Sequence, residues 1–122
     1  MERLLLSVVD DDESVRESLP DLLREFGFAA RAFSSAREFL SSGYLDDTKC
    51  LILDVSMPGM SGLDLQQELK RRGNKIPIIF ITGQKDEDIQ KQAFREGAVM
   101  FLYKPFGDSA LLDAVNAALP PK

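Results

Sequence analysis

Polar side chains that can do chemistry stand where apolar runs end. Three aspartates, Asp10–Asp12, follow the run "LLLSVV", and Asp54 follows "CLIL". Thr82 and Lys104 take the same place after two later apolar runs. Carboxylates, a hydroxyl and an ammonium that meet in one pocket could bind a hard divalent cation and a phosphoryl group.

The elements that would position these residues alternate along the chain. Short apolar runs and longer amphipathic segments follow one another, which is typical of strand–helix repeats around a parallel sheet. In such a sheet, ligands bind beyond the carboxyl ends of the strands. The polar residues should therefore meet if the first, third, fourth and fifth strands are neighbours. The five predicted strands are Leu4–Val9, Ala29–Phe33, Cys50–Leu53, Ile78–Ile81 and Val99–Tyr103.

Helical periodicity separates the predicted strands. Gly27 is expected to stop the first helix, and Asp86 and Asp108 are expected to cap the last two. The predicted helices cover residues 15–26, Ala36–Leu40, Leu63–Arg71, Glu87–Glu96 and Ser109–Leu119.

The acidic groups indicate a metal site. Two carboxylates about 4 Å apart repel by roughly 4 kcal/mol at an effective dielectric constant near 20, so clustering them for stability alone is unfavourable. The chain has no histidine, and an all-oxygen ligand set favours Mg²⁺ over zinc. Beside such an ion, Asp54 could act as a nucleophile, Lys104 as a positive charge and Thr82 as a hydrogen-bond donor.

Simpler interpretations exist for each residue alone. The acidic run Asp10–Glu13 could only favour a helix dipole, and an aspartate after a strand is usually a turn residue. Only the joint occurrence of these residues, each at a different strand end, favours a functional site.

Composition limits the other possibilities. The 122 residues predict one domain over 1–122, and 15 basic against 20 acidic side chains give a net charge of −5. Direct nucleic-acid binding is therefore not expected, and neither is membrane insertion, because no apolar stretch is long enough. The lone Cys50 is expected to be a packed thiol and fits a cytoplasmic location.

Four motifs, in this order and spacing, carry a resemblance to a known family. They are "VVDDDESVR", "LILDVSMPGMSG", "IIFITG" and "FLYKPF". Over its whole length the chain resembles the CheY-like receiver domain of two-component response regulators, and within that family the FixJ type. The resemblance implies an α/β fold: a flavodoxin-like, doubly wound (βα)5 sheet of five parallel strands in the order 2-1-3-4-5.

The resemblance also implies roles for individual residues. Asp54 would accept a phosphoryl group from the phosphohistidine of a sensor histidine kinase. Asp10, Asp11, Asp54 and the backbone carbonyl of Ser56 would hold Mg²⁺, with Asp10 acting mainly through water. Lys104 would contact the phosphoryl oxygens.

Further implied features concern switching and rate. Thr82 and Phe101 resemble the family's switch pair: on phosphorylation the hydroxyl would move toward the new oxygens and the ring would turn inward. Ser56 and Gln84 would flank the phosphoryl group and affect its lifetime. The Lys104–Pro105 peptide bond is expected to be cis.

The leading hypothesis is a phospho-accepting signalling module that is not an enzyme beyond its own phosphorylation and dephosphorylation. An aspartate-nucleophile phosphatase is an alternative, but such enzymes usually carry a second Asp where this chain has Ser56. Flavin binding on the same fold is disfavoured, because the three aspartates after the first strand would repel FMN. A receiver-like scaffold that is never phosphorylated also remains open.

The resemblance extends to partners. A homodimer could form through the fourth helix and fifth strand, a region that contains Ile89, Ala93, Val99 and Tyr103. A FixJ-type protein would carry a DNA-binding output domain after this chain, which itself should not bind DNA.

Overall fold

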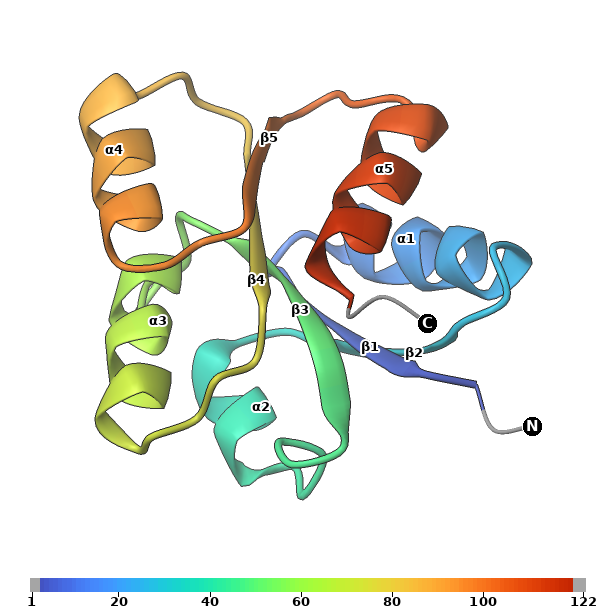
Figure 1. The fold of residues 1–122 in the computed structure, drawn as a ribbon, viewed down its shortest axis with the longest axis horizontal. Coiled ribbons are helices and arrows are strands. Elements are labelled where there is room, and N and C mark those ends of the chain that lie inside the picture. The colour runs from blue at the N-terminus through green and yellow to red at the C-terminus, as the bar shows by residue number, and fades with distance from the viewer. Residues whose placement is uncertain (1–2, 120–122) are drawn as a thin grey trace.

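The computed structural model describes residues 3–119 and is a three-layer α/β structure (Figure 1). One sheet of five parallel strands has the order β2-β1-β3-β4-β5, as the resemblance implied. In chain order the elements are β1 (Leu5–Val9), α1 (Glu13–Glu25), β2 (Ala29–Phe33), α2 (Ala36–Ser41), β3 (Thr48–Asp54), α3 (Gly62–Arg71), β4 (Ile78–Thr82), α4 (Glu87–Arg95), β5 (Met100–Tyr103) and α5 (Asp108–Ala118).

Helices cover both faces of this sheet, and each face has its own hydrophobic core. On one face, Leu6 of β1 and Ile79 of β4 pack with side chains of α1 and α5. On the other, Leu53 and Phe80 pack with side chains of α2, α3 and α4. Burial on both faces explains why the central strands read as nearly continuous apolar runs. No helix within residues 3–119 is both long and apolar enough to cross a membrane.

β3 is longer than the predicted Cys50–Leu53, because it begins at Thr48 and ends at Asp54. Thr48 is buried, and its hydroxyl is hydrogen-bonded on both sides. It lies 2.7 Å from the hydroxyl of Ser7 on β1 and donates to the carbonyl oxygen of Tyr44 at 2.7 Å. A polar side chain can enter the core when it is hydrogen-bonded. Hydrophobicity alone could not reveal this residue as part of the strand.

Two of the three cap assignments from the sequence hold. Asp86 caps α4 by accepting hydrogen bonds from the backbone N–H groups of Asp88 and Ile89. Gly27, with φ +99°, follows the end of α1 as predicted. The assignment of Asp108 is wrong: Gly107 has the extended backbone of the cap, and Asp108 is the first helical residue. Its carboxylate still lies at the positive end of the helix dipole.

Cys50 is fully buried in β3, as expected of a packed thiol. Burial raises its pKa to about 12, because a thiolate would lose its hydration there. The thiol therefore stays protonated and unreactive at neutral pH.

Candidate functional site

The predicted chemical residues converge at the carboxyl ends of the central strands. Asp10 directly follows β1, Asp54 ends β3, Thr82 ends β4, and Lys104 directly follows β5. These four strands are consecutive neighbours in the sheet, so parallel pairing brings their ends to one edge. The sequence predicted this convergence, and the structure confirms it.

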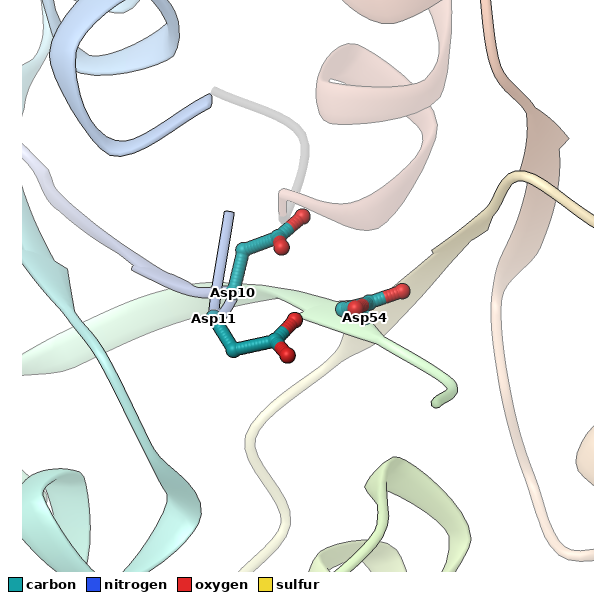
Figure 2. A group of neighbouring side chains, drawn as sticks. All are labelled: Asp10, Asp11 and Asp54. Atoms are coloured by element: carbon teal, nitrogen blue, oxygen red, sulfur yellow. The ribbon is translucent and has the colours of Figure 1, made fainter. Parts of the chain in front are cut away.

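Three carboxylates form the centre of the site. Asp10, Asp11 and Asp54 each offer an oxygen within 4.8 Å of the other two. Figure 2 shows the three side chains gathered beyond the ends of β1 and β3. Asp10 and Asp54 are buried, whereas Asp11 is exposed and faces the solvent side of the cluster.

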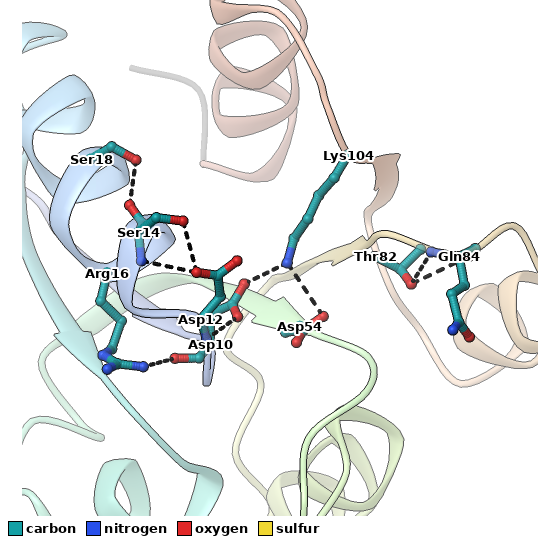
Figure 3. Close-up of polar contacts among 9 residues, drawn as sticks. All are labelled: Asp10, Asp12, Ser14, Arg16, Ser18, Asp54, Thr82, Gln84 and Lys104. Carbon is teal, nitrogen blue, oxygen red and sulfur yellow. Dashed lines mark hydrogen bonds and ion pairs between the residues drawn. The ribbon is translucent and has the colours of Figure 1, made fainter.

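Within residues 3–119, Lys104 is the only basic residue that forms an ion pair with these carboxylates. Its Nζ lies 2.9 Å from Oδ2 of Asp10 and 3.8 Å from Oδ1 of Asp54 (Figure 3). Burial alone would lower the pKa of Lys104, but the hydrogen bond to Asp10 and the nearby carboxylates outweigh it and raise the pKa. The ammonium is therefore charged at neutral pH, and the Lys104–Pro105 bond is cis as expected.

The electrostatics of Asp54 differ from those of an ordinary aspartate. Burial, together with the charges of Asp10 and Asp11, raises its pKa to about 7 against the opposing effect of Lys104. The one ammonium of Lys104 does not balance the three carboxylates of this cluster. Without a further cation, the ionised form of Asp54 is disfavoured.

This imbalance predicts a stability difference between the wild type and Asp54→Asn. In the unfolded chain the carboxyl has its ordinary pKa of 3.8, against about 7 in the fold. Between these values the unfolded state loses the proton first, so the carboxyl increasingly destabilises the fold as pH rises, and the cost is constant above about pH 7. In a chelator, thermal unfolding should show the stability advantage of Asp54→Asn over the wild type growing from about pH 4 to about pH 7 and then staying constant.

Asp12→Asn is the matched control for that experiment. Hydrogen bonds from the side chain and backbone of Ser14 lower the pKa of Asp12, so neutralising it should give no advantage at high pH. Adding Mg²⁺ at high pH should narrow the gap between the wild type and Asp54→Asn. A gap that does not change with pH would contradict the electrostatic account.

The loop after β1 is held by contacts that sequence reasoning missed. The backbone N–H of Asp12 donates to Oδ1 of Asp10 at 2.9 Å, and Nη1 of Arg16 donates to the carbonyl oxygen of Asp10 at 3.0 Å. Asp12 also caps α1. Together with Lys104, these contacts occupy both carboxylate oxygens and the carbonyl of Asp10, which fixes its orientation. The motif contained Arg16, but no periodicity distinguished it.

Gly62 was also missed as a determinant of the site. A Cβ at this position would lie 2.3 Å from the carbonyl oxygen of Asp54 and 3.0 Å from Cα of Val55. The N–H of Gly62 donates to the carbonyl oxygen of Val55 at 2.9 Å. The start of α3 thus packs directly on the backbone of Asp54, and only glycine fits there.

The remaining predicted residues lie around this centre. The backbone N–H of Gln84 donates to the buried hydroxyl of Thr82 at 3.2 Å (Figure 3), and Ser56 and Gln84 are exposed. Phe101 is 8% exposed and packs between Phe80 and Tyr103. Its ring already lies inward here, while the hydroxyl of Thr82 contacts the backbone of Gln84.

The donor set fits a hard divalent cation. The ligand atoms of Asp10, Asp11 and Asp54 are all oxygens, and burial together with their mutual repulsion raises the pKa of Asp54. A divalent ion would remove that repulsion, and carboxylate oxygens are ligands that Mg²⁺ accepts. The acidic pocket can therefore bind a metal ion of this class.

Comparison with known proteins identifies related sequences over nearly the whole chain. The model of the response regulator receiver domain matches residues 6–116. Nodulation protein W of Bradyrhizobium diazoefficiens is 53% identical over 116 residues, which are 95% of the chain and 51% of that protein. Transcriptional regulatory protein FixJ of Azorhizobium caulinodans is 45% identical and covers 97% of the chain and 56% of that protein.

The crystal structure of FixJ-N has the same fold. Its TM-score is 0.85 at 38% sequence identity, over 97% of this chain and 94% of that one. The chain spans about half the length of the curated relatives it matches.

Proposed function

The chain belongs to the response regulator receiver domain family and is of the FixJ type, and we propose that Asp54 is its phosphoryl acceptor. The observation that supports this most is the meeting of Asp54 with Asp10, Asp11 and Lys104 at one edge of the sheet. A carboxylate at the end of a central strand, close to two further carboxylates that could hold a cation and to an ammonium, suits phosphoryl transfer.

In the proposed reaction, a carboxylate oxygen of Asp54 attacks the phosphorus of a phosphohistidine. The new O–P bond forms as the P–N bond to the imidazole breaks, and the histidine keeps the electron pair. Lys104 stabilises the charge on the transferred oxygens. Mg²⁺, held by Asp10, Asp11, Asp54 and the backbone carbonyl of Ser56, would neutralise further negative charge.

The switch we propose starts from the positions of Thr82 and Phe101. The new phosphoryl group adds about two negative charges and attracts the Thr82 hydroxyl, which would exchange its contact with Gln84 for one with a phosphoryl oxygen. Because the Phe101 ring already packs inward, we expect phosphorylation to stabilise this rotamer rather than create it. Contacts made only in the phosphorylated state shift the population toward it.

The direct test uses acetyl phosphate as a small phosphoryl donor and intact-mass spectrometry as the readout. The wild-type chain should gain the mass of one phosphoryl group in the presence of Mg²⁺ and none in a chelator. A chain that gains no such adduct under either condition would overturn the proposed function.

Gln84 is expected to affect how long the phosphoryl group persists. Its side chain is exposed beside Thr82, from where the amide can reach the path of the attacking water. Gln84→Ala should lengthen the lifetime roughly threefold or more, because the amide would no longer orient that water. Loss of the adduct is followed by mass spectrometry after the donor is removed, with the exposed Gln92→Ala as control. Equal lifetimes for Gln84→Ala and the wild type would refute this role.

Partners follow from the family and the length of the relatives. A sensor histidine kinase is the proposed phosphoryl donor, and a DNA-binding output domain is proposed for the protein to which this chain belongs. We also propose a phosphorylation-dependent homodimer through α4 and β5, where Phe94 is 42% exposed. The alternative of a small-substrate phosphatase gains no support from the family match or from these regulators.

A further inference from the structure

We propose that the open edge of β2 (Ala29–Phe33) binds an extended acidic segment of a partner polypeptide as an added strand. β2 is the outermost strand, at the opposite side of the sheet from β5 (Figure 1). A groove of about 540 Å³ follows this edge, and Arg3, Arg24 and Arg31 line it. The site is distinct from the cluster of Asp10, Asp11 and Asp54 and independent of the proposed phosphorylation.

The backbone of β2 leaves hydrogen-bonding groups directed into the groove. The N–H of Ala29 donates to Leu4 and the carbonyl oxygen of Phe33 accepts from Asp10, so these residues face β1. Because alternate residues of a strand direct their main-chain groups to opposite sides, Ala30 and Ala32 face outward.

One outward group already has a partner within the chain, which an added strand would have to share or displace. Nη2 of Arg24 donates to the carbonyl oxygen of Ala30 at 2.9 Å. The N–H of Ala30 and both main-chain groups of Ala32 still face the groove. An added strand gains affinity from such main-chain groups and specificity from the side chains that flank them.

The charges at this edge select the occupant. The chain as a whole carries −5, but none of the described residues that line the groove is acidic. The guanidinium of Arg31 is stacked on the ring of Tyr44, 3.9 Å from its centroid, so it is partly ordered before any partner arrives. Arginines flanking an open strand edge suit a segment with alternating Asp or Glu side chains.

The same charges disfavour two other occupants. Arg24 already forms an ion pair with Asp21, but a second copy that paired through its own β2 would still bring Arg3 and Arg31 of both copies together, which costs free energy. A nucleic acid would meet only three cations on an acidic protein and could not use the strand's main-chain pattern. The acidic peptide is therefore the occupant that the edge fits.

The test uses a fluorescein-labelled peptide of alternating Glu and Thr, and fluorescence anisotropy with the full chain. An otherwise identical peptide with N-methylated backbone amides keeps the charge but cannot pair as a strand. The first peptide should bind at least tenfold more tightly than the second. On its addition, hydrogen exchange at the amides of Ala30 and Ala32 should slow.

Two variants and a charge-matched control separate the contribution of the arginine charge to peptide binding from that of the main-chain groups. Arg31→Glu should weaken peptide binding at least tenfold, whereas Lys91→Glu, on the exposed face of α4, should leave it within about twofold. Ala32→Pro removes an outward N–H without removing a bond to β1 and should also weaken binding. If Ala32→Pro does not fold, the hydrogen-exchange measurement on the wild type decides.

Several outcomes would overturn the proposal. The first is no peptide binding, in which case the arginines only protect an exposed edge from aggregation. Equal affinity for the N-methylated peptide would mean that the arginines bind anions non-specifically and that no strand is added. If a single-stranded oligonucleotide binds more tightly than the peptide, the edge is a nucleic-acid site and not a polypeptide site.

Discussion

Asp54→Asn is expected to abolish the phosphoryl adduct that acetyl phosphate and Mg²⁺ form on the wild type. Asparagine has the shape of aspartate and should fill the same buried place at the end of β3. Its amide, however, is neither an anionic nucleophile nor a ligand that replaces a carboxylate well. Intact-mass spectrometry at a fixed donor concentration measures the loss directly.

Asp12→Asn provides the control for that experiment. It removes one carboxylate from the same acidic run, but Asp12 contacts Ser14 and caps α1 rather than joining the three-carboxylate cluster. Asparagine caps a helix about as well as aspartate, so the fold should persist and the adduct should form. An adduct that survives in Asp54→Asn, or that is lost equally in Asp12→Asn, would place the acceptor elsewhere.

Among glycine-to-alanine substitutions at the glycines that the structure describes, Gly62→Ala is expected to lower the free energy of unfolding the most. The new Cβ would lie 2.3 Å from the carbonyl oxygen of Asp54, which is a main-chain atom and cannot rotate away. Either α3 or the end of β3 must shift. Overpacking of this kind costs about 3 kcal/mol, which should lower the unfolding midpoint by roughly 10 °C.

Gly83→Ala is the matched control, since a Cβ there has no atom within 4 Å and its φ needs no glycine. Its free energy of unfolding should change by less than about 1 kcal/mol. The Gly62→Ala variant should also take up the phosphoryl group more slowly than the wild type, because its Asp54 is displaced. This rate is measured at a temperature at which the variant is still folded. Equal stability of Gly62→Ala and the wild type would contradict the close approach.

The positions that sequence reasoning missed share a physical cause. Thr48 entered the strand because Ser7 and Tyr44 satisfy its hydroxyl. Arg16 fixes Asp10 through a backbone carbonyl, and Gly62 is required by the backbone of β3. Each depends on a neighbour that only the folded chain brings close. Hydrophobic pattern and motif spacing contain no information on such contacts.

The wrong cap assignment at Asp108 arises from a local preference and not from a distant contact. Aspartate is a favoured cap residue, and its position before an apolar helical pattern made it the obvious choice. The choice between adjacent residues depends on backbone angles, and the extended conformation falls on Gly107. Propensity fixes the approximate start of a helix but not its first residue.

The sequence by itself determined the fold class and the chemical composition of the site. Alternating buried runs and amphipathic segments specify a parallel sheet, and strand ends in such a sheet meet at one edge, so Asp10, Asp54, Thr82 and Lys104 could be grouped in advance. Only the tertiary structure decided the electrostatic state of that group. Burial of Asp54, its distance from Lys104 and the placement of arginines along the open edge of β2 depend on how separate elements pack, because electrostatic interactions vary with distance and with exclusion of water.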